Sequence, residues 1–514
     1  MLILTTEQMK HLENISANMG VDHMRLMENA GSIAAKKIND TTSLENKNVV
    51  ILCGKGNNGG DSAVVARKLI GQCKKISLIV VSSIPSTKQA YDMFERLVGT
   101  SVEILQCDFD QSTAFTRIIN ADIIIDGIFG TGFKGQLTGK IADIITACNN
   151  AKMSCGCKFS LDIPSGIEGD TGVCANNCFK ADYTIVFGAY KLAQFTSPAD
   201  LYFGEVLFAD IAIPKGAMDV CKYTAKITDT EYFKAKFPLR DKIANKGDFG
   251  KVLNIAGCKE MTGAAYLSTI SCLRSGAGLV CLASSEYVCQ TLGSKLIENT
   301  FLPLKENENG FISSSNIPLI LKRCENATAI TIGCGLGLCS DTKQIVYSLI
   351  ENCNKPLIID ADGINAISEN INILKTAKAK IIITPHPGEM ARLLKKDIKY
   401  VRQNRIKVAQ EFAVEYGVCV VLKGHGSVIC SPDGTMHISN KGGPVLAKGG
   451  SGDVLTGIIG AFISQGLSLF DSAALGVYVH GMTGDICANQ FGVCSVIARD
   501  IIDMLKTVFK QLNR

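Results

Sequence analysis

The stretch NVVILCGKGNNGGDSAVVARKL, residues 48–69, decides the fold. Its first six residues, Asn48 to Cys53, form an apolar run that is typical of a buried strand. A glycine-rich turn follows at residues 54–62 and leads into a helical pattern from Ala63 to Leu69. A buried strand, a glycine turn and a helix in this order predict a parallel β-sheet covered by helices.

Similar apolar runs recur along the chain, each followed by turn residues. In the first half they predict strands at residues 48–53, 76–81, 121–125 and 158–162. A second series predicts strands at residues 251–256, 279–283, 329–332, 356–359, 380–383 and 418–422. The chain is therefore expected to contain two successive α/β domains, in agreement with its length of 514 residues.

The boundary between these domains is predicted after Pro214, because residues 215–246 have many charges and no long apolar period. We expect a first domain at residues 1–215, a linker at 216–238 and a second domain at 239–514. The chain has 46% hydrophobic and 20% charged residues, which excludes a largely disordered or collagen-like protein.

Composition also restricts the partners and the surroundings of the protein. The net charge of +5 comes without a block of like charges, so no nucleic-acid partner is expected. The N-terminal residues lack a secretory signal pattern, and no run of 18 apolar residues occurs, so we expect a cytoplasmic protein without a membrane partner. Parallel-sheet enzymes of this size often associate symmetrically, and a homo-oligomer is expected.

The 21 cysteines are scattered, mostly within apolar runs, and are expected to be buried, reduced thiols. Cys155 and Cys157, followed by Cys174 and Cys178, lack the paired C-x2-C spacing of a structural zinc site. No zinc is therefore expected.

The turn at residues 54–62 suits an anion. Glycines let backbone N–H groups approach a phosphate closely, and the N-terminus of the following helix adds positive potential. The turn matches neither the P-loop nor the G-x-G-x-x-G dinucleotide pattern, so its spacing alone leaves a purely structural turn equally open.

Two acidic residues end predicted strands. Asp126 precedes a second glycine-rich loop, and Asp162 begins the sequence DIPSG. Ligands of open α/β sheets bind at the carboxyl ends of strands, so both aspartates, with Asn58 and Ser165, are candidates to contact one ligand and one hard cation. The alternative is that each aspartate only caps the next helix.

Four motifs of the first half occur in a specific order: LMENAG at residues 26–31, GKGNNGGD at 54–61, DGIFGTG at 126–132 and DIPSG at 162–166. In this order they resemble the NAD(P)H-hydrate epimerase domain, from Met1 to about Lys215. The resemblance implies a Rossmann-like three-layer fold, a potassium ion bound by Asn58, Asp126 and Ser165, and proton transfer by Asp162. It implies substrate contacts at Asn57, Asn58, Gly59, Gly60, Asp61, Gly130, Thr131, Gly132, Phe133, Lys134, Gly135, Gln136 and Asp162.

One position departs from this family pattern. Ser62 stands where the family commonly has glycine, and its small side chain is expected to narrow the turn without abolishing it.

The expected chemistry fits a carboxylate. Epimerising a hydrated nicotinamide at its sixth ring carbon requires loss of the hydroxyl proton with ring opening, or loss and return of water. A positioned carboxylate can transfer such a proton. Asp162 is the residue predicted to transfer this proton.

Near the C-terminus, AKGGSGDVLTG at residues 447–457 leads into an amphipathic stretch that continues to Gln465. Successive glycine N–H groups form an anion-binding nest at a helix N-terminus, with Asp453 at its edge. This motif resembles the anion hole and catalytic base of ribokinase-like kinases, and a structural helix start is the alternative. KGHGS at residues 423–427 is a second glycine turn after a strand, which in this resemblance contacts the nucleotide.

Six further motifs decide what the second half resembles: NKGDFGKVL at residues 245–253, MTGAA at 261–265, LRSGAG at 273–278, GCGLG at 333–337, DADGIN at 360–365 and TPHPGE at 384–389. Together they resemble the ADP- or ATP-dependent NAD(P)H-hydrate dehydratase, from about Leu239 to the end, and imply a ribokinase-like α/β domain. The implied substrate contacts are Ala264, Gly335, His386 and Asp453. The implied nucleotide contacts are Lys423, Gly424, His425, Gly426, Ser427 and Gly452.

The second half departs from the usual pattern at three positions, without loss of a charged catalytic group. Asn245 stands where histidine is common, Cys334 where proline is common, and Gly363 where alanine is common.

In the dehydratase resemblance, His386 orients the hydrated ring while Asp453 helps to remove the hydroxyl proton. The terminal phosphate of ADP or ATP is transferred to that oxygen and leaves with it. Magnesium is expected to neutralise the nucleotide phosphates. No unmistakable magnesium motif occurs, although Asp360, Asp362 and Glu389 are available.

The predicted function is thus bifunctional repair: an isomerase interconverts the R and S forms of hydrated NADH and NADPH, and a lyase dehydrates the S form using ADP or ATP. The expected partners are these small molecules. The enzymatic alternative is a ribokinase-like small-molecule kinase with an accessory Rossmann-like domain. The other alternative is a non-catalytic metabolite sensor.

Overall fold

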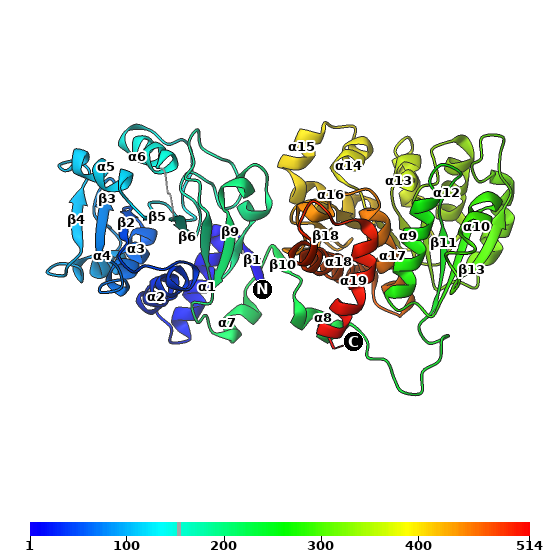
Figure 1. The fold of residues 1–514 in the computed structure, drawn as a ribbon, viewed down its shortest axis with the longest axis horizontal. Helices are drawn as coiled ribbons and strands as arrows, with labels where there is room; N and C mark the ends of the chain where they lie inside the picture. Colours follow the sequence, from blue (N-terminus) through cyan, green and yellow to red (C-terminus); the bar gives the residue numbers. More distant parts are fainter. Residues whose placement is uncertain (152–155, 514) are drawn as a thin grey trace. The chain divides into compact units, whose positions relative to one another are not determined.

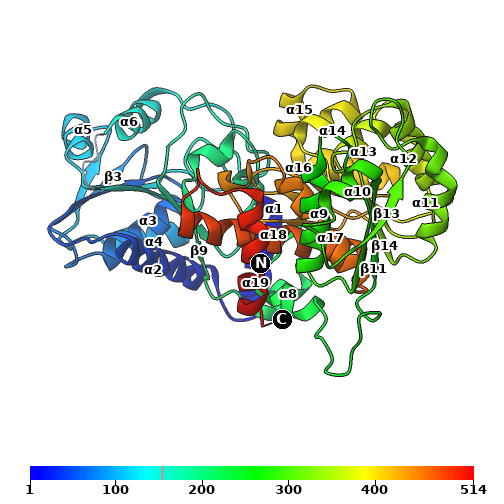
Figure 2. The ribbon, with the colours of Figure 1, turned by 45° about the vertical axis from the view of Figure 1, so that its right-hand side comes forward.

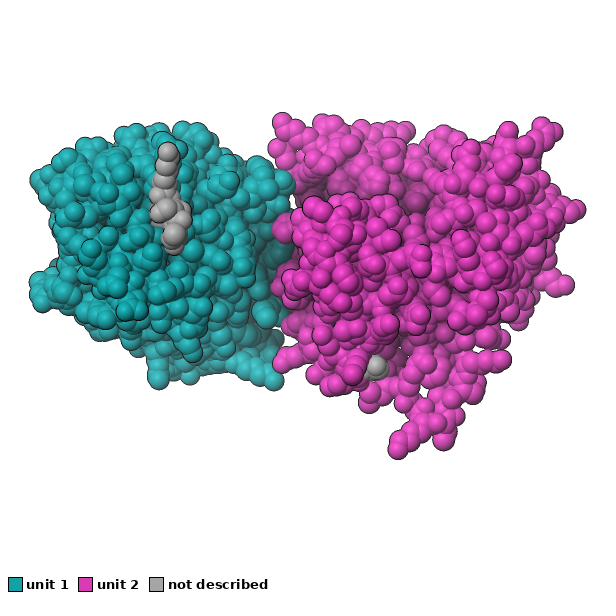
Figure 3. Space-filling model, viewed as in Figure 1, with its two compact units in different colours: residues 1–224 teal, residues 225–514 magenta. Residues whose placement is uncertain are grey.

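A computed structural model describes residues 1–151 and 156–513 of the chain. It divides into two compact units, Met1–Thr224 and Ala225–Arg514, which are coloured separately in Figure 3. The division falls inside the segment expected to be a linker. Each unit is an α/β structure with its own sheet and core, as predicted.

Unit 1 contains a seven-stranded sheet whose strands are all parallel. Its order, seen in Figure 1, is β4 (Glu103–Gln106), β3 (Lys75–Val80), β2 (Asn48–Cys53), β5 (Ile123–Gly127), β6 (Cys157–Leu161), β7 (Tyr183–Phe187) and β9 (Glu205–Ala209). Beside it, β1 (Leu2–Leu4) pairs in parallel with the short strand β8 (Tyr190–Lys191). The predicted strand at residues 48–53 coincides with β2, whereas β1, β4, β7, β8 and β9 were not expected.

Helices cover both faces of this sheet. Figure 2 shows α2 (His23–Thr41), α3 (Asn57–Lys68) and α4 (Lys88–Glu95) on one face, and α5 (Gln111–Ile119) and α6 (Gly139–Asn150) on the other. Helix α1 (Thr6–Asn18) contributes Met9 and Leu12 to the core on the α2 side. Side chains of a strand alternate between faces, so Val49 and Ile51 enter this core while Val50 and Leu52 enter the core beneath α5 and α6.

The start of α3 differs from the prediction. The helix begins at Asn57, six residues before Ala63, so most of the glycine-rich segment is helical rather than a loop. Close packing explains this: a Cβ on Gly60 would lie 2.6 Å from the Sδ of Met27 and 2.7 Å from the Cα of Ala90. Burial against neighbouring helices outweighs the low intrinsic helix propensity of glycine.

Unit 2 contains a longer mixed sheet. Its order is β13 (Thr300–Leu304), β12 (Leu279–Ser285), β11 (Lys251–Ile255), β14 (Ala329–Ile332), β15 (Leu357–Ile359), β16 (Ile381–Ile383), β17 (Cys419–Leu422), β18 (Val428–Cys430), β19 (Met436–Ile438) and β10 (Ala225–Ile227). Strands β13 to β17 are parallel, and β18 runs antiparallel to both of its neighbours. All six strands predicted for the second half are present.

Two groups of helices complete unit 2. The first contributes to one core with the sheet and comprises α9 (Thr262–Arg274), α17 (Ser451–Ser464), α18 (Leu469–Phe491) and α19 (Ala498–Gln511). The buried side chains of the second group lie outside this core, in α11 (Ile317–Cys324), α12 (Ser340–Asn352), α13 (Asp362–Ile367), α14 (Pro387–Leu394) and α16 (Arg405–Tyr416). Shorter helices are α10 (Glu286–Leu292) and α15 (Ile398–Gln403).

The segment expected to be a linker, residues 216–238, is folded. It holds most of α7 (Lys215–Val220), all of β10, and α8 (Thr230–Lys236). Ala217 is buried in the core of unit 1, and Phe233 is buried in unit 2, where it stacks on Phe237. The apolar residues here are too widely spaced to give a period in the sequence, although several are buried by tertiary packing.

The described cysteines are free, and most are buried, as predicted. Cys155 lies outside the described residues. Among the described helices, none combines the length and the apolar character needed to cross a lipid bilayer.

Candidate active sites

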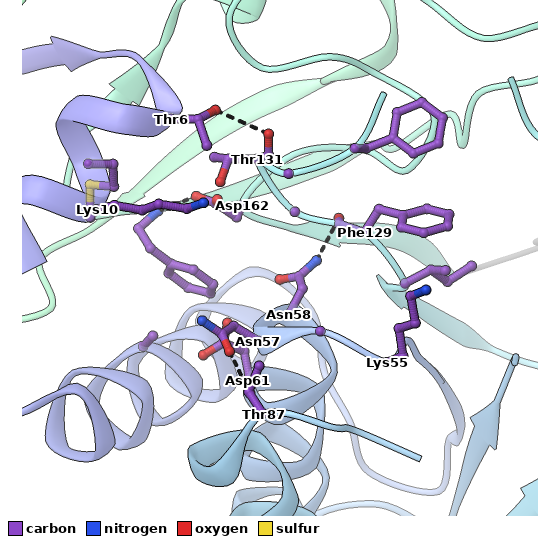
Figure 4. Close-up of a pocket in the computed structure, with 18 of the residues that line it drawn as sticks. Thr6, Lys10, Lys55, Asn57, Asn58, Asp61, Thr87, Phe129, Thr131 and Asp162 are labelled. Carbon is purple, nitrogen blue, oxygen red and sulfur yellow. Dashed lines mark hydrogen bonds between the residues drawn. The ribbon is translucent and has the colours of Figure 1, made fainter. Parts of the chain in front are cut away.

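A cavity of about 890 Å³ opens in unit 1 at the carboxyl ends of β2, β5, β6 and β7 (Figure 4). The strand order reverses between β2 and β5, because the chain runs from β2 through β3 to β4 before it returns to β5. Such reversals leave a crevice in which ligands of open α/β sheets bind. The cavity therefore lies where the sequence placed the ligand.

Most of the predicted substrate residues line this cavity. They are Asn57, Asn58, Asp61, Gly130, Thr131, Gly132, Phe133, Lys134, Gln136 and Asp162. Gly59 and Gly60 are buried beneath the turn instead, and a Cβ on Gly59 would lie 1.9 Å from the carbonyl oxygen of Gly54. Gly135 lies in an exposed turn with φ of 94°. These three glycines allow close packing and chain reversal.

Asp162 follows β6 and has a left-handed backbone with φ of 66°, a conformation that non-glycine residues adopt mainly under local constraint. Its Oδ1 accepts a hydrogen bond from the backbone N–H of Phe187 at 3.3 Å and pairs with the ammonium of Lys191. Lys191 is only 1% exposed. Lys191 was not predicted from the sequence; its place just after the unpredicted strand β7 was the available signal.

Two further carboxyl groups line the same cavity, Glu13 of α1 and Asp61 of α3. Burial, together with the charges of Asp162 and Glu13, raises the pKa of Asp61 well above its ordinary value. Burial and the charge of Asp162 also raise the pKa of Glu13. Glu13 was not predicted, because it lies in an ordinary amphipathic helix.

The three residues predicted to bind potassium lie together behind the cavity wall. The carboxylate of Asp126 is fully buried and accepts the hydroxyl of Ser165 at 2.6 Å and its N–H at 2.8 Å. The hydroxyl of Ser165 in turn accepts the N–H of Phe129 at 3.0 Å, and the amide of Asn58 donates to the carbonyl of Phe129 at 2.8 Å. Burial raises the pKa of Asp126 to about 6, although the bonds from Ser165 oppose this rise.

One oxygen of this group has no protein partner. The Nδ2 of Asn58 donates to the carbonyl oxygens of Phe129 and Leu161, but its Oδ1 is buried without a hydrogen bond among the described residues. A buried acceptor without a partner is costly. An unpaired amide oxygen next to a buried aspartate suits a hard cation such as potassium.

Ser62 lies within α3 rather than in the expected turn. Its buried hydroxyl donates to the carbonyls of Leu52 and Asn58, at 3.2 and 3.0 Å. It also occupies the space next to Gly127, where a Cβ would lie 1.8 Å from the Ser62 oxygen. A glycine is therefore required at position 127 beside Ser62.

In unit 2, three predicted residues lie together at the carboxyl ends of β15, β16 and β17: Asp360, Glu389 and Lys423. We call these three residues the charged row. Lys423 places its ammonium 2.8 Å from Asp360 Oδ1 and 4.0 Å from Glu389 Oε2. Asp360 also accepts the hydroxyl of Thr456 at 2.7 Å. Lys423, predicted to contact the nucleotide, thus also neutralises a fully buried aspartate.

Asp453 lies in the first turn of α17, which begins after Gly450 in a left-handed conformation with φ of 88°. The buried thiol of Cys334 and the carboxylates of Asp360 and Asp453 have atoms within 4.8 Å of one another. Burial, with the charge of Asp360, raises the pKa of Asp453 to about 6. A raised pKa suits a group that accepts a proton near neutral pH.

His386 lies at the other end of this row and caps α14. Its Nδ1 accepts the N–H groups of Gly388 and Glu389 at 2.9 and 3.2 Å, and its Nε2 lies 3.4 Å from Glu389 Oε1. Burial and the charge of Lys423 lower the pKa of His386, which favours the neutral ring. Its side chain is 51% exposed, so it remains accessible to a substrate.

The other residues predicted for unit 2 lie in two places. A Cβ on Gly335 would lie 2.7 Å from the Cβ of Ala264, which brings these two residues together. In the turn at residues 423–427, Ser427 exchanges hydrogen bonds with Gly424, and the guanidinium of Arg405 donates to the carbonyl of His425. Arg405 was not predicted; it is a buried cation that fixes this turn from beneath.

Gly452 and Gly363 are sites of close approach. A Cβ on Gly452 would lie 3.4 Å from the Nζ of Lys423, so the start of α17 lies against the charged row. A Cβ on Gly363 would lie 2.8 Å from the side chain of Ile359, which explains the departure from alanine. Asn245, the other departure besides Cys334, closes a turn by accepting the N–H of Gly247 at 2.8 Å.

The carboxylates suggested for magnesium fit that ion poorly as a set. Asp360 and Glu389 are engaged with Lys423, and Asp362 accepts the N–H of Gly337 at 2.8 Å. Cys334, Asp360 and Asp453 have ligand atoms within 4.8 Å of one another, but a thiol is not a magnesium ligand. These side chains therefore do not form a magnesium site by themselves.

Comparison with known proteins agrees with this geometry in both halves. The family model described as YjeF-related protein N-terminus matches residues 23–193, and the NAD(P)H-hydrate dehydratase model matches residues 252–507. The bifunctional NAD(P)H-hydrate repair enzyme of Moorella thermoacetica is 33% identical, over 100% of this chain and 97% of that protein. The chain belongs to this family of bifunctional NAD(P)H-hydrate repair enzymes.

A second repair enzyme, from Thermofilum pendens, is 32% identical over 100% of this chain and 97% of its own length. Among solved structures, the ADP/ATP-dependent NAD(P)H-hydrate dehydratase of Bacillus subtilis, co-crystallised with ATP and Mg²⁺, is 28% identical. The match covers 56% of this chain and 99% of the Bacillus subtilis chain, with a TM-score of 0.49.

Family membership decides among the three predicted functions. Relatives named as bifunctional repair enzymes extend over the whole chain, so a kinase with an accessory domain and a non-catalytic sensor are both set aside. This repair enzyme is an isomerase and a lyase in one chain.

Proposed function

We propose that unit 1 interconverts the R and S forms of hydrated NADH and NADPH, and that unit 2 dehydrates the S form with ADP or ATP. The observation that supports this division is that each unit holds its own aspartate beside a glycine-rich helix start: Asp162 faces the cavity next to α3, and Asp453 lies in the first turn of α17. The first site lies within residues 1–215 and the second within residues 239–514, the ranges expected for the epimerase and the dehydratase.

In unit 1, Asp162 is the proton-transfer residue. It lies at the cavity wall with its carboxylate held by the N–H of Phe187 and by Lys191. Asn57, Asp61 and the loop from Gly130 to Gln136 surround the space in which the hydrated ring and its phosphates bind. The N-terminus of α3 favours the negative phosphates.

Asn58, Asp126 and Ser165 are the proposed potassium ligands. The unpaired, buried Oδ1 of Asn58 and the buried carboxylate of Asp126 support this proposal. When bound, potassium supplies a positive charge that offsets the buried carboxylate. The protein itself contributes the order of this region, since Asn58 and Ser165 both hold the backbone of Phe129 at the cavity edge.

In unit 2, Asp453 is proposed to accept the hydroxyl proton of the hydrated ring while that oxygen attacks the terminal phosphorus of the nucleotide. This attack breaks the bond between that phosphorus and the bridging oxygen, so the nucleotide leaves one phosphate shorter. The carbon–oxygen bond of the new ester then breaks and releases phosphate, and the neighbouring ring carbon loses a proton to solvent, which forms the ring double bond of the reduced nicotinamide. His386, Ala264 and Gly335 orient the ring. Lys423 to Ser427 and Gly452 surround the nucleotide, whose phosphates meet the N-terminus of α17.

Magnesium is proposed to enter with the nucleotide phosphates rather than on a preformed set of carboxylates. We also propose a cytoplasmic, homo-oligomeric enzyme. The number of free thiols supports a reducing compartment, and symmetric association is common among enzymes of this size.

The test uses the full-length enzyme and the purified R and S hydrates. Epimerisation is followed by chromatography without nucleotide, and dehydration is followed by the absorbance of reduced nicotinamide after adding ADP or ATP. We expect R and S to interconvert without nucleotide, and only S to be dehydrated directly. The proposal would be refuted if the enzyme neither interconverted the two hydrates nor dehydrated the S hydrate.

A further inference from the structure

We propose that Lys191 is a positioning residue of the epimerase, which keeps the negative charge of the cavity on Asp162 and leaves Asp61 as the neutral proton donor. This inference rests on the function proposed for unit 1, because it needs Asp162 as the base. It assigns Lys191, Asp61 and Asp162 three distinct tasks.

The first observation is the burial of Lys191. Its side chain is 2% exposed, yet its ammonium lines the cavity through its contact with Asp162. The ammonium also donates to the carbonyl of Phe187 at 3.1 Å, and the Lys191 backbone N–H donates to Gln194 at 2.9 Å. Burying a charged lysine is costly without a partner, so Asp162 is held ionised opposite it.

The second observation concerns the other two carboxyl groups. Asp61 is buried and lines the cavity, and no described lysine or arginine forms an ion pair with it. Glu13 likewise has no ion pair among the described residues. Three carboxyl groups that share one cavity cannot all ionise cheaply, and Asp162, which is in contact with the ammonium of Lys191, is the one favoured to ionise. The negative charge therefore belongs to Asp162, and Asp61 retains its proton.

The chemistry of ring opening needs one base and one acid. The ionised Asp162 accepts the hydroxyl proton as the carbon–oxygen double bond forms and the bond from that carbon to the ring nitrogen breaks. The electron pair of that bond moves to the nitrogen, which takes a proton from the neutral carboxyl of Asp61. Closure on the opposite face returns both protons, so atoms and charges balance over the cycle.

The experiment compares the full-length wild type with Lys191→Met, Lys191→Arg, Asp61→Asn and Asp162→Asn. The kcat and KM of epimerisation are measured from about pH 5 to 9. This range includes the ordinary pKa of histidine and begins close to that of carboxyl groups. Dehydration of S hydrate by unit 2 is the control for an intact chain. The other titratable side chains lining the cavity are Lys10, Glu13, His23, Lys55 and Lys134.

We expect Lys191→Met to lower kcat about 10²-fold with little change in KM, since a displaced catalytic group costs about that much. Its activity should also require a higher pH than that of the wild type, because Asp162 without its cation holds a proton more tightly. Lys191→Arg should recover part of the rate and the original acidic limb. Asp61→Asn should lose kcat without moving that limb.

Other outcomes overturn the inference. Wild-type kcat in Lys191→Met, or a loss of kcat with an unmoved acidic limb, removes the positioning role of Lys191. If Lys191→Met unfolds unit 1, as judged by its melting transition, Lys191→Ala with added methylamine replaces it. Recovery that increases with the ammonium form supports the role, and no recovery in this folded variant refutes it.

The failure of this inference is distinguishable from that of the proposed function. Full epimerase activity in Asp162→Asn refutes the assignment of Asp162 itself. An inactive Asp162→Asn together with a normal Lys191→Met leaves the proposed function standing and refutes only the role of Lys191. An active Asp61→Asn refutes its role as the proton donor.

Discussion

Ser165 donates both its hydroxyl and its backbone N–H to the carboxylate of Asp126, at 2.6 and 2.8 Å. These two bonds fix a fully buried carboxylate. Ser165 and Asn58 both bond the backbone of Phe129, and Asn58 Oδ1 has no hydrogen-bond partner among the described residues. The cavity wall and the proposed potassium site therefore share one set of interactions. Changing the cation should change the epimerase and leave unit 2 unaffected.

Replacing potassium by tetramethylammonium at constant ionic strength is expected to lower the melting temperature of unit 1 and its epimerase activity. The bulky cation cannot contact Asn58 and Asp126 together. Asp126→Ala should remove this sensitivity, because the charge that favours the cation is gone. Calorimetry in the two salts measures the effect, and a wild type indifferent to potassium in both respects would show that the site is wrongly assigned.

Asp162→Asn is expected to abolish epimerisation while dehydration of the S form stays unchanged. The amide keeps the shape of the side chain but cannot accept the substrate proton as a carboxylate does. Both half-reactions are measured on purified hydrates. Unimpaired epimerisation in this variant would remove Asp162 from its role.

Asp453→Asn is expected to lower the turnover of dehydration by ~10²- to 10⁴-fold, the usual contribution of a general base. Its melting temperature should stay near that of the wild type, since Gly450 rather than Asp453 is the N-cap of α17. Epimerisation provides the internal control. A stable variant with full turnover would contradict the mechanism proposed for unit 2.

The pH dependence of dehydration should reflect the raised pKa of Asp453, about 6. The base must be ionised, so turnover should rise about tenfold per pH unit below that value and level off above it. Cys334, Asp360, Asp362 and Lys423 are the neighbouring groups that influence it. A turnover that stays constant from pH 7 down to about 5, with the chain still folded, would exclude Asp453 as the base.

Lys423→Met is expected to destabilise unit 2 by about 3 kcal/mol, because it leaves the fully buried Asp360 without its cation. Denaturation by urea measures the loss. The double variant Lys423→Met with Asp360→Asn is the matched control and should recover part of the stability, since the charge of Asp360 is removed together with its partner. Equal losses in the single and double variants would show that the ion pair is not the cause.

Sequence patterns were sufficient for much of the fold. The strand at residues 48–53 was predicted with the bounds of β2, and the six strands of the second half were all found. In unit 1 the strands β1, β4, β7, β8 and β9 were missed, and in unit 2 the strands β10, β13, β18 and β19 were missed. The start of α3 was placed six residues late. The glycines of α3 predict a loop when taken alone, and only their packing against Met27 and Ala90 makes them helical.

The candidate sites likewise contain features that the sequence predicted and features that it did not. The sequence by itself determined that Asn58, Asp126 and Asp162 end or follow strands and that Asp453 lies at a helix start, because strand periodicity and glycine turns are local properties. Only the tertiary structure decided that Lys191 pairs with Asp162, that Lys423 pairs with Asp360 and that Asn58 Oδ1 has no partner within residues 1–151 and 156–513. Residues 29 and 63 positions apart form these ion pairs. Such contacts depend on which strands become neighbours, and that order is set by the packing of the whole unit rather than by any local pattern.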